Sequence, residues 1–111
     1  MEIQYGTAFK RQVKRLARRY RRIKSDLEPI IQALMEGETP GDKLTSHGHA
    51  LYKVRAQNRD SQRGKSGGYR VIYYLKTDSL CILVTVYAKS DQGDIAPDAL
   101  ERLILEVESE S

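Results

Sequence analysis

The sequence predicts an α+β fold, in which an N-terminal strand and an α-helical hairpin pack on a small antiparallel β-sheet of about four strands, followed by a short C-terminal helix. In the first third of the chain, apolar residues recur at intervals of three and four, the period of a helix with one buried face. From residue 51 to residue 89, β-branched and aromatic residues form runs bounded by turn residues, as strands do. The predicted order is β-α-α-β-β-β-α, and the 111 residues suffice for a single domain over residues 1–111.

The first two elements are a strand and a strongly amphipathic helix. Residues 1–5 alternate well enough for a short strand, and Gly6 ends it. Thr7 is placed to cap the helix that follows, which we expect over about residues 8–24. The apolar stripe of this helix consists of Phe9, Val13, Leu16, Ala17, Tyr20 and Ile23.

A second helix is predicted to begin at Ser25. Ser25 and Glu28 have the spacing of a capping box, in which each side chain bonds a free backbone amide at the start of the helix. The apolar face consists of Leu27, Ile30, Ile31, Leu34 and Met35. Gly37 ends the helix. Because almost no residues separate the two helices, they should form an antiparallel hairpin whose apolar stripes cover one face of a sheet.

The remaining elements are strands and a last helix. We predict a loop over residues 38–50 and strands over 51–57, 69–76 and 80–89, the last two joined by a short turn into an antiparallel hairpin. A long polar loop separates the first of these strands from the second. The last helix should begin near residues 94–97, and its apolar stripe consists of Leu100, Leu103, Ile104 and Val107.

Composition excludes several classes of protein. Apolar residues make up 40% and charged residues 31%, as in a globular domain rather than a fibrous or disordered one. The single cysteine, Cys81, excludes an internal disulfide and a four-cysteine zinc site, and we expect it to be a small buried hydrophobe. No apolar run has the length of a membrane span or the pattern of a signal peptide, so we expect a cytoplasmic protein that binds no membrane.

The charge is unevenly distributed along the chain. The net charge is +4, from 19 Lys and Arg against 15 Asp and Glu. Residues 1–76 hold 17 basic and 7 acidic residues, whereas residues 77–111 hold 2 and 8. This asymmetry predicts a body that binds a polyanion and an end that is acidic.

The first predicted helix carries much of the positive charge. It has no acidic residue, and its basic residues are Lys10, Arg11, Lys14, Arg15, Arg18, Arg19, Arg21, Arg22 and Lys24. Like charges four residues apart repel by about 0.2 to 0.5 kcal/mol, so an unbalanced set indicates a nucleic-acid backbone as partner. A solvated helix face, an acidic protein or an anionic membrane is the alternative. The predicted nucleic-acid-binding residues are the first eight of the set, with Arg63 and Lys65 on the long loop.

A second basic group lies on the predicted strands. Lys53 and Arg55 share one face of their strand, Arg70 opens the next strand, and Lys89 closes the last. On a sheet with helices on one side, these cations would gather on the open face. Such a cluster suits RNA cleavage by attack of the 2′-hydroxyl on the adjacent phosphorus, because arginine holds the developing charge and a lysine crowded by cations can take up a proton. Ordinary surface charge on a half-exposed sheet is the alternative.

Other candidate sites are weaker. His47 and His49 could bind a metal, but no third ligand of suitable spacing accompanies them, so no metal or other cofactor is predicted. Tyrosines could stack on bases, although tyrosines in strands usually pack in the core. Strand parity places Tyr69 and Tyr73 on one face and Tyr74 on the other.

Five stretches of the chain have a familiar order and spacing: FKRQVKRLARRYRRIKSDL, GDKL, LYKVRAQ, KSGGYRVIYYL and ILVTVYAKSDQGDI. Together they resemble the RelE/ParE superfamily of type II toxin–antitoxin toxins, and the HigB-like branch looks closest. The most specific pieces are GGYRVIYYL and VTVYAKSDQ. The resemblance covers about residues 8–105.

The resemblance implies a ribosome-dependent mRNA endoribonuclease, or mRNA interferase, which inhibits translation, uses no metal or cofactor and is neutralised by a cognate antitoxin. Its other partners would be ribosomal RNA and mRNA, and its oligomeric state stays open. Arg70 matches the arginine with which the family stabilises the phosphate transition state. Lys53 and Arg55 match two basic positions on the preceding strand, with Lys53 the candidate general base and Arg55 a phosphate ligand. Lys89 falls where the family has a basic residue after the last strand.

Two departures from the family pattern leave the general acid unassigned. Ser90 stands where some RelE members have an arginine. Some members also have an aromatic residue or a histidine near the C-terminus, whereas the stretch after Ser90 has Asp91 and no aromatic residue. Tyr87, or a lysine of the long loop, could supply the proton. Two other functions stay open: a ParE-like inhibitor of DNA gyrase that cuts nothing, and a degenerate module that binds only RNA or antitoxin. The basic helix and the strand cations favour the nuclease, because a gyrase inhibitor needs neither.

Overall fold

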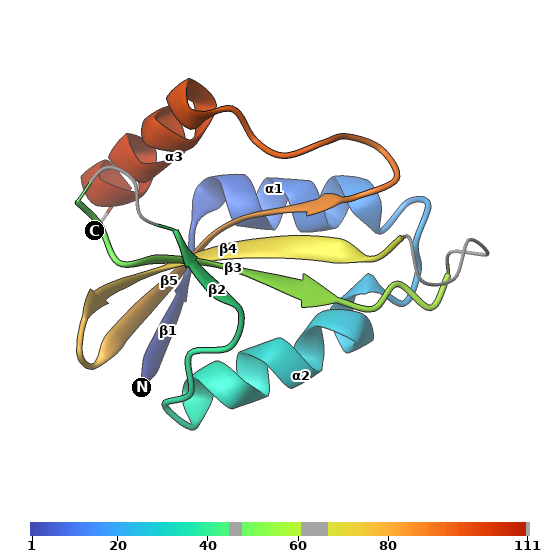
Figure 1. Ribbon diagram of the computed structural model, residues 1–111. Helices are drawn as coiled ribbons and strands as arrows, with labels where there is room; N and C mark the ends of the chain where they lie inside the picture. Colours follow the sequence, from blue (N-terminus) through green and yellow to red (C-terminus); the bar gives the residue numbers. More distant parts are fainter. Residues whose placement is uncertain (45–47, 61–66, 111) are drawn as a thin grey trace.

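The structure is a computed structural model that describes residues 1–44, 48–60 and 67–110 (Figure 1). The strands are β1 (Glu2–Tyr5), β2 (Asp42–Leu44), β3 (Leu51–Ala56), β4 (Tyr69–Thr77) and β5 (Leu80–Ala88), and the helices are α1 (Thr7–Leu16), α2 (Ile23–Met35) and α3 (Pro97–Glu110). The predicted α+β fold is confirmed, with five strands in the sheet rather than four. None of the helices described is both long and apolar enough to cross a membrane.

The strands form one sheet in the order β1-β5-β4-β3-β2. β1 runs parallel to β5, and all other neighbours are antiparallel. The additional strand, β2, lies within the segment predicted as a loop, because its three residues are too few to show an alternating pattern. Its pairing with β3 fixes its position, since Asp42 lies opposite Lys53 and Leu44 lies opposite Leu51.

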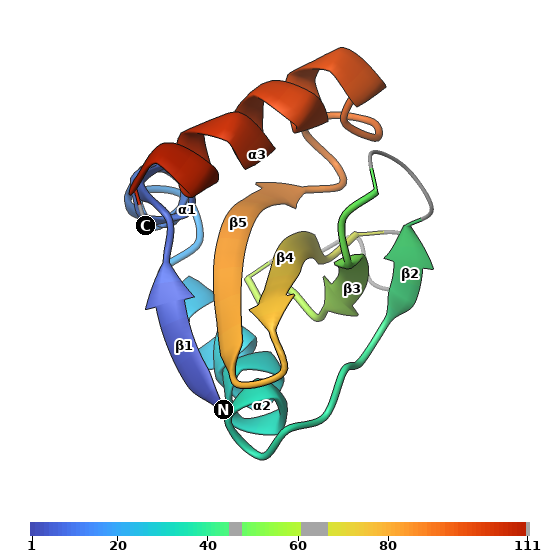
Figure 2. The same ribbon diagram turned by 90° about the vertical axis from the view of Figure 1, so that its left-hand side faces the viewer.

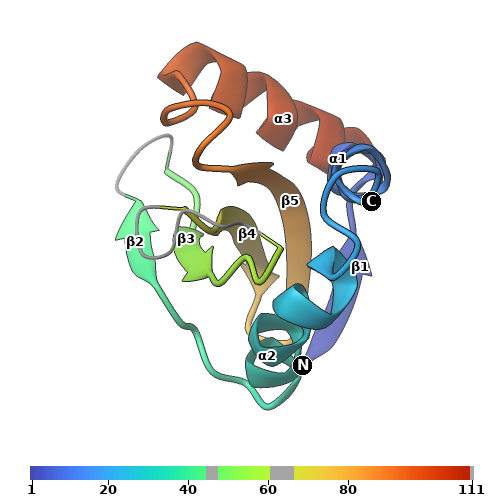
Figure 3. The same ribbon diagram turned by 90° about the vertical axis from the view of Figure 1, so that its right-hand side faces the viewer.

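The sheet has a hydrophobic core on each face. Figures 2 and 3 show the sheet between α2 and α3. On one face, Phe9 of α1 packs in a core with Tyr73, and on the other face Ile104 of α3 packs in a core with Ile72 and Tyr74. The predicted parity of the tyrosines is therefore confirmed. The expectation of helices on one side only is wrong, because the central strands carry apolar residues on both faces and α3 buries the second set.

The first predicted helix is shorter than expected. α1 ends at Leu16, and residues 17–22 form turns before α2 begins at Ile23. In these turns the N–H groups of Arg18 and Arg19 bond carbonyl oxygens three residues earlier. The arginines crowded into this segment repel one another, which weakens a continuous helix. The turns also reverse the chain, so that Leu16 and Ile23 both pack in the same core.

Both predicted N-terminal helix caps are wrong. Thr7 is the first residue of α1, and its N–H donates to Glu110 Oε1 of α3 at 3.1 Å. Ser25 lies within α2, where its hydroxyl donates to the Arg22 carbonyl oxygen at 3.0 Å. Instead, Asp60 in the loop after β3 accepts the Arg22 N–H at 2.6 Å. Carboxylates from distant segments therefore bond the N–H groups at both helix starts, and a local sequence pattern does not show such partners.

Gly37 and Gly41 both have positive φ angles, of 87° and 94°. Gly37 follows α2 as predicted, and a Cβ there would meet nothing within 4 Å, whereas a Cβ at Gly41 would lie 2.4 Å from the Lys53 carbonyl oxygen. We expect Gly41→Ala to lower the free energy of unfolding by about 2 to 4 kcal/mol, because steric overlap adds to the left-handed conformation, and Gly37→Ala by about 1 kcal/mol. Urea unfolding measures both, and equal losses would contradict the close packing at Gly41.

A polar contact holds α3 to the sheet in addition to its core. The Tyr74 hydroxyl donates to Glu108 Oε1 at 2.7 Å, and Lys76 Nζ lies 3.6 Å from Glu108 Oε2. Burial, with the Glu108 hydrogen bond next, raises the pKa of Tyr74 to about 12. The hydrogen bond from Tyr74, ahead of the charge of Lys76, lowers the pKa of Glu108 below its usual value of 4.5.

This lowered pKa predicts a pH-dependent contribution of Glu108 to stability. Because the folded state favours the ionised carboxylate, the contribution is complete above the usual pKa of 4.5 and is lost as the pH falls through the lower pKa of the folded state. Glu108→Gln should therefore lower Tm at neutral pH and match the wild type in strong acid. Thermal unfolding at both pH values measures this, with the exposed Glu106→Gln on the same helix as control. A Tm difference that persists in acid would contradict the assignment.

Candidate active site

Three adjacent strands place Arg55, Arg70 and Tyr87 in one row across the sheet. Arg55 of β3 lies opposite Arg70 of β4, and Arg70 lies opposite Tyr87 of β5. Directly opposed residues on neighbouring strands point to the same face, with Cβ atoms about 5 Å apart. The register of the sheet therefore brings two of the predicted catalytic residues together and adds a tyrosine beside them.

Gly68 lets the start of β4 approach the end of β3. Its φ is 96°, and a Cβ at this position would lie 2.7 Å from the Ala56 carbonyl oxygen and 3.5 Å from Arg55 Nε. Any side chain here would push the two strands apart at the point where Arg55 and Arg70 face each other. The glycine before the tyrosine–arginine pair thus has a direct effect on the geometry of the row.

Lys53, Tyr87 and Lys89 converge on one carboxylate oxygen, Asp94 Oδ1. Lys53 Nζ donates to it at 3.2 Å, the Tyr87 hydroxyl at 3.4 Å and Lys89 Nζ at 3.5 Å. Lys53 lies two residues before Arg55 on the same face of β3, and Lys89 directly follows β5. The four predicted catalytic residues therefore lie near one end of the same sheet face. We call Lys53, Arg55, Arg70 and Lys89 the strand cluster.

The charges in the site favour an ionised Asp94 and a neutral Tyr87. The hydrogen bond from Lys53 and its charge, followed by the charge of Lys89, lower the pKa of Asp94. Burial, followed by the charge of Asp94, raises the pKa of the Tyr87 hydroxyl, although the charge of Arg70 opposes this rise. Tyr87 therefore keeps its proton at neutral pH and has one to donate.

The site is an open hollow where α3 begins. Its volume is about 270 Å³, and its lining includes Lys53, Ile72, Tyr87, Asp94, Pro97 and Leu100. α3 covers much of the apolar part of this sheet face and begins beside the hollow, which stays open to solvent. The N-terminus of α3, the positive end of its helix dipole, lies at the same place.

The basic residues predicted to bind nucleic acid divide between α1 and the turns after it. Lys10, Arg11, Lys14 and Arg15 are exposed on α1, and Arg18, Arg19, Arg21 and Arg22 are exposed in residues 17–22. Arg19 Nη1 donates to Asp91 Oδ1 at 2.9 Å, and Asp91 belongs to the same loop as Asp94. We call residues 17–22 the basic turn. The basic turn therefore adjoins the loop at the edge of the candidate site. Arg63 and Lys65 lie outside the described residues.

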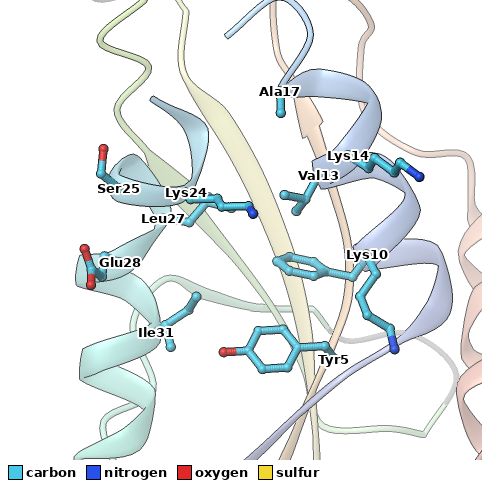
Figure 4. A pocket seen from close by; sticks show the side chains of 11 residues that line it. Tyr5, Lys10, Val13, Lys14, Ala17, Lys24, Ser25, Leu27, Glu28 and Ile31 are labelled. Atoms are coloured by element: carbon cyan, nitrogen blue, oxygen red, sulfur yellow. The ribbon is translucent and has the colours of Figure 1, made fainter. Parts of the chain in front are cut away.

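A separate groove of about 1000 Å³ lies between α1 and α2 (Figure 4). Val13 of α1 and Ile31 of α2 point into it, whereas Lys14 points away (Figure 4). This groove belongs to the helical-hairpin face of the sheet, and the strand cluster belongs to the other face. The two surfaces are therefore distinct.

A comparison with known protein families decides which family this fold represents. The family described as the RelE toxin of the RelE / RelB toxin–antitoxin system matches residues 7–106. The chain belongs to the RelE toxin family. The matched range includes the strand cluster, the basic turn and most of α3 in this RelE toxin. None of the curated proteins compared with the chain matches it.

Family membership has two functional consequences. A RelE toxin is one half of a toxin–antitoxin pair, so this protein has an antitoxin as partner. RelE toxins are generally mRNA-cleaving toxins, and a cluster of cations on an accessible sheet face is consistent with a substrate that carries a phosphate backbone.

Sequence reasoning missed Asp94 at this candidate site. The sequence placed it only near the start of the last helix, and no spacing rule connects it with Lys53, which lies 41 positions earlier. The acid that the sequence did single out, Asp91, is bonded to Arg19 instead. Only the strand register shows that Asp94 lies near the lysines, because it places Lys53 of β3 and Lys89 after β5 beside the loop that leads to α3.

Two other predicted positions lie elsewhere. Cys81 is fully buried in β5, and burial raises the pKa of its thiol to about 12, so its expected role as a buried hydrophobe is confirmed. His49 Nδ1 lies 3.4 Å from the Tyr74 hydroxyl oxygen, on the side of the sheet that α3 covers. His47 lies outside the described residues.

Proposed function

We propose that this RelE toxin is a ribosome-dependent endoribonuclease that inhibits translation by cleaving mRNA. The observation that carries the proposal is the strand cluster at one accessible end of the sheet, with the protonated hydroxyl of Tyr87 among its cations. Family membership supports an mRNA-cleaving toxin, and the cluster supports cleavage by attack of the 2′-hydroxyl on the adjacent phosphorus.

The reaction assigns one role to each side chain. The 2′-oxygen bonds to phosphorus while its proton passes to Lys53, the proposed general base. Arg70, assisted by Arg55 and Lys89, holds the extra negative charge on the phosphorus oxygens. The bond from phosphorus to the 5′-oxygen then breaks, and that oxygen takes the proton of Tyr87. The products are a 2′,3′-cyclic phosphate and a 5′-hydroxyl, so the proton taken up by Lys53 balances the one lost by Tyr87.

The partners of this reaction follow from the positions of the remaining cations. The exposed basic residues of α1 and of the turns after it would dock on ribosomal RNA, because many cations crowded on one exposed segment favour a phosphate backbone. The proposed place of action is the cytoplasm, where the ribosomes are. Binding of the cognate antitoxin neutralises the toxin.

The proposed function is tested by expressing the toxin in a growing cell and mapping the 5′ ends of its mRNA. Growth arrest with cuts aligned to codons is the expected result, and purified ribosomes should be required for efficient cleavage in vitro. Intact mRNA with DNA damage would indicate gyrase inhibition instead, and the absence of arrest would indicate a module that only binds RNA or antitoxin. Efficient cutting of naked RNA would contradict ribosome dependence.

A further inference from the structure

The carboxylate of Asp94 occupies the centre of the proposed active site. Its Oδ1 accepts hydrogen bonds from Lys53, Tyr87 and Lys89, all within 3.5 Å. These donors come from two strands and from the residue that follows the second strand. We propose that Asp94 is an internal competitor of the substrate phosphate, so that RNA enters the site only when Asp94 leaves it. This inference rests on the function proposed above.

The chemistry of the contacts makes the two anions mutually exclusive. Carboxylate and phosphate oxygens accept hydrogen bonds from the same ammonium and hydroxyl donors, at similar distances. Lys53, Tyr87 and Lys89 aim at a single oxygen position, so a phosphate oxygen that uses these donors must take the place of Asp94 Oδ1. A phosphate that approached while Asp94 stayed would meet a negative charge at the centre of the site.

The position of Asp94 allows it to leave without disturbing the core. Its side chain is 64% exposed, whereas those of Lys53 and Lys89 are 28% and 34% exposed, so the carboxylate lies over the lysines from the solvent side. The residues from 90 to 94 are all exposed, and a Cβ at Gly93 would meet nothing within 4 Å. Only the short segment around Asp94 has to move.

Both sides of this segment are anchored independently of Asp94. Asp91 is bonded to Arg19 at 2.9 Å, and Ile95 packs against the core beneath α3. The loop can therefore release the carboxylate from the lysines and still return it to the same place. Asp94 thus sets how strongly an anion must bind in order to occupy the site. It disfavours weakly bound anions more than RNA that is also held by the basic residues of α1 and of the turns after it.

The direct test is the affinity for inorganic phosphate, measured by NMR titration at fixed ionic strength and neutral pH. Asp94→Asn preserves the shape of the side chain and removes its charge, and we expect it to tighten phosphate binding about fivefold. Asp91→Asn, three residues earlier on the loop, and Asp42→Asn, opposite Lys53 on β2, are matched controls that should change the affinity by less than about twofold.

A second variant tests whether the gain in phosphate affinity arises at this site rather than at other surface cations. When Lys53 is replaced by alanine, the gain from Asp94→Asn should disappear, because the anion position has lost a principal donor. In ribosome-dependent cleavage, Asp94→Asn should lower the toxin concentration that gives half-maximal rate. Thermal unfolding checks that each variant is folded.

The outcomes separate this inference from the proposed function. Phosphate binding by Asp94→Asn that is equal to or weaker than that of the wild type would overturn the inference, even if mRNA is cleaved. A gain in phosphate affinity that survives in the Lys53→Ala background would also overturn it. Tighter phosphate binding that depends on Lys53, in a protein that cuts no mRNA, would support the competition and contradict the nuclease proposal.

Discussion

Replacing Arg70 with alanine is expected to slow ribosome-dependent mRNA cleavage about 100- to 1000-fold. Arg70 lies in the middle of the row between Arg55 and Tyr87, where a guanidinium can hold two phosphate oxygens at once. Its Nη1 also donates to the Tyr69 carbonyl oxygen at 3.3 Å, which helps to fix the orientation of the guanidinium. Because the extra charge appears only in the transition state, the maximal rate should fall more than the affinity.

Two further variants make the Arg70 prediction specific. Arg70→Lys keeps the positive charge but loses the two parallel hydrogen bonds, so its rate should lie between those of the wild type and of Arg70→Ala. Lys43→Ala removes an exposed lysine of β2 from the face opposite to the strand cluster and should leave cleavage unchanged. Primer extension on a ribosome-bound message measures all three. An Arg70→Ala rate within about tenfold of the wild type would contradict the role of Arg70.

Reversing the charge of Lys14, Arg15 and Arg18 to glutamate is expected to abolish co-sedimentation of the toxin with ribosomes. These three residues are exposed at the end of α1 and in the turns after it, where they would neutralise phosphates of ribosomal RNA. Binding that survives should also depend less on salt. The slope of the logarithm of the binding constant against the logarithm of the salt concentration should fall by about 2 to 3.

The choice of these residues follows from the ion pairs in the structure. Arg19 and Arg22 lie 2.9 Å and 3.9 Å from carboxylate oxygens of Asp91 and Asp60, so reversing them would place like charges in contact and disturb the fold. Reversing the charge of Lys43 on β2 changes the net charge on another part of the surface and is the control. Undiminished co-sedimentation of the triple variant, with the control variant equally bound, would contradict docking through this surface.

The long strands could be predicted from the sequence, and the elements fixed by distant contacts could not. The β-branched and aromatic runs in β4 and β5 are long enough to indicate strands, and the parity of Tyr73 and Tyr74 follows from the two-residue period of any strand. β2 has three residues and exists through its pairing with β3. The start of α2 was predicted from a local capping pattern at Ser25, but the structure uses a carboxylate from the loop after β3.

The geometry of the candidate site could likewise be predicted from the sequence only in part. That Lys53 and Arg55 share a face is a property of any strand, and the sequence was sufficient for it. That Arg55 lies opposite Arg70 depends on the register of β3 against β4, which no local pattern determines. Asp94 was out of reach for sequence reasoning, because a loop residue acquires its partners only when the ends of three strands and the start of α3 have been brought together.

The parallel pairing of β1 with β5 determines when this toxin can fold during its own synthesis. Glu2 to Tyr5 pair with Leu80 to Leu83, so the first strand to be made finds its place only after the last strand has emerged. Contacts between residues so far apart in the chain form slowly, since a large loop must close before they are gained. A growing chain therefore has neither a complete sheet nor the row of Arg55, Arg70 and Tyr87 until β5 has left the ribosome. The proposed nuclease activity consequently arises only after β5 has been made and has left the ribosome.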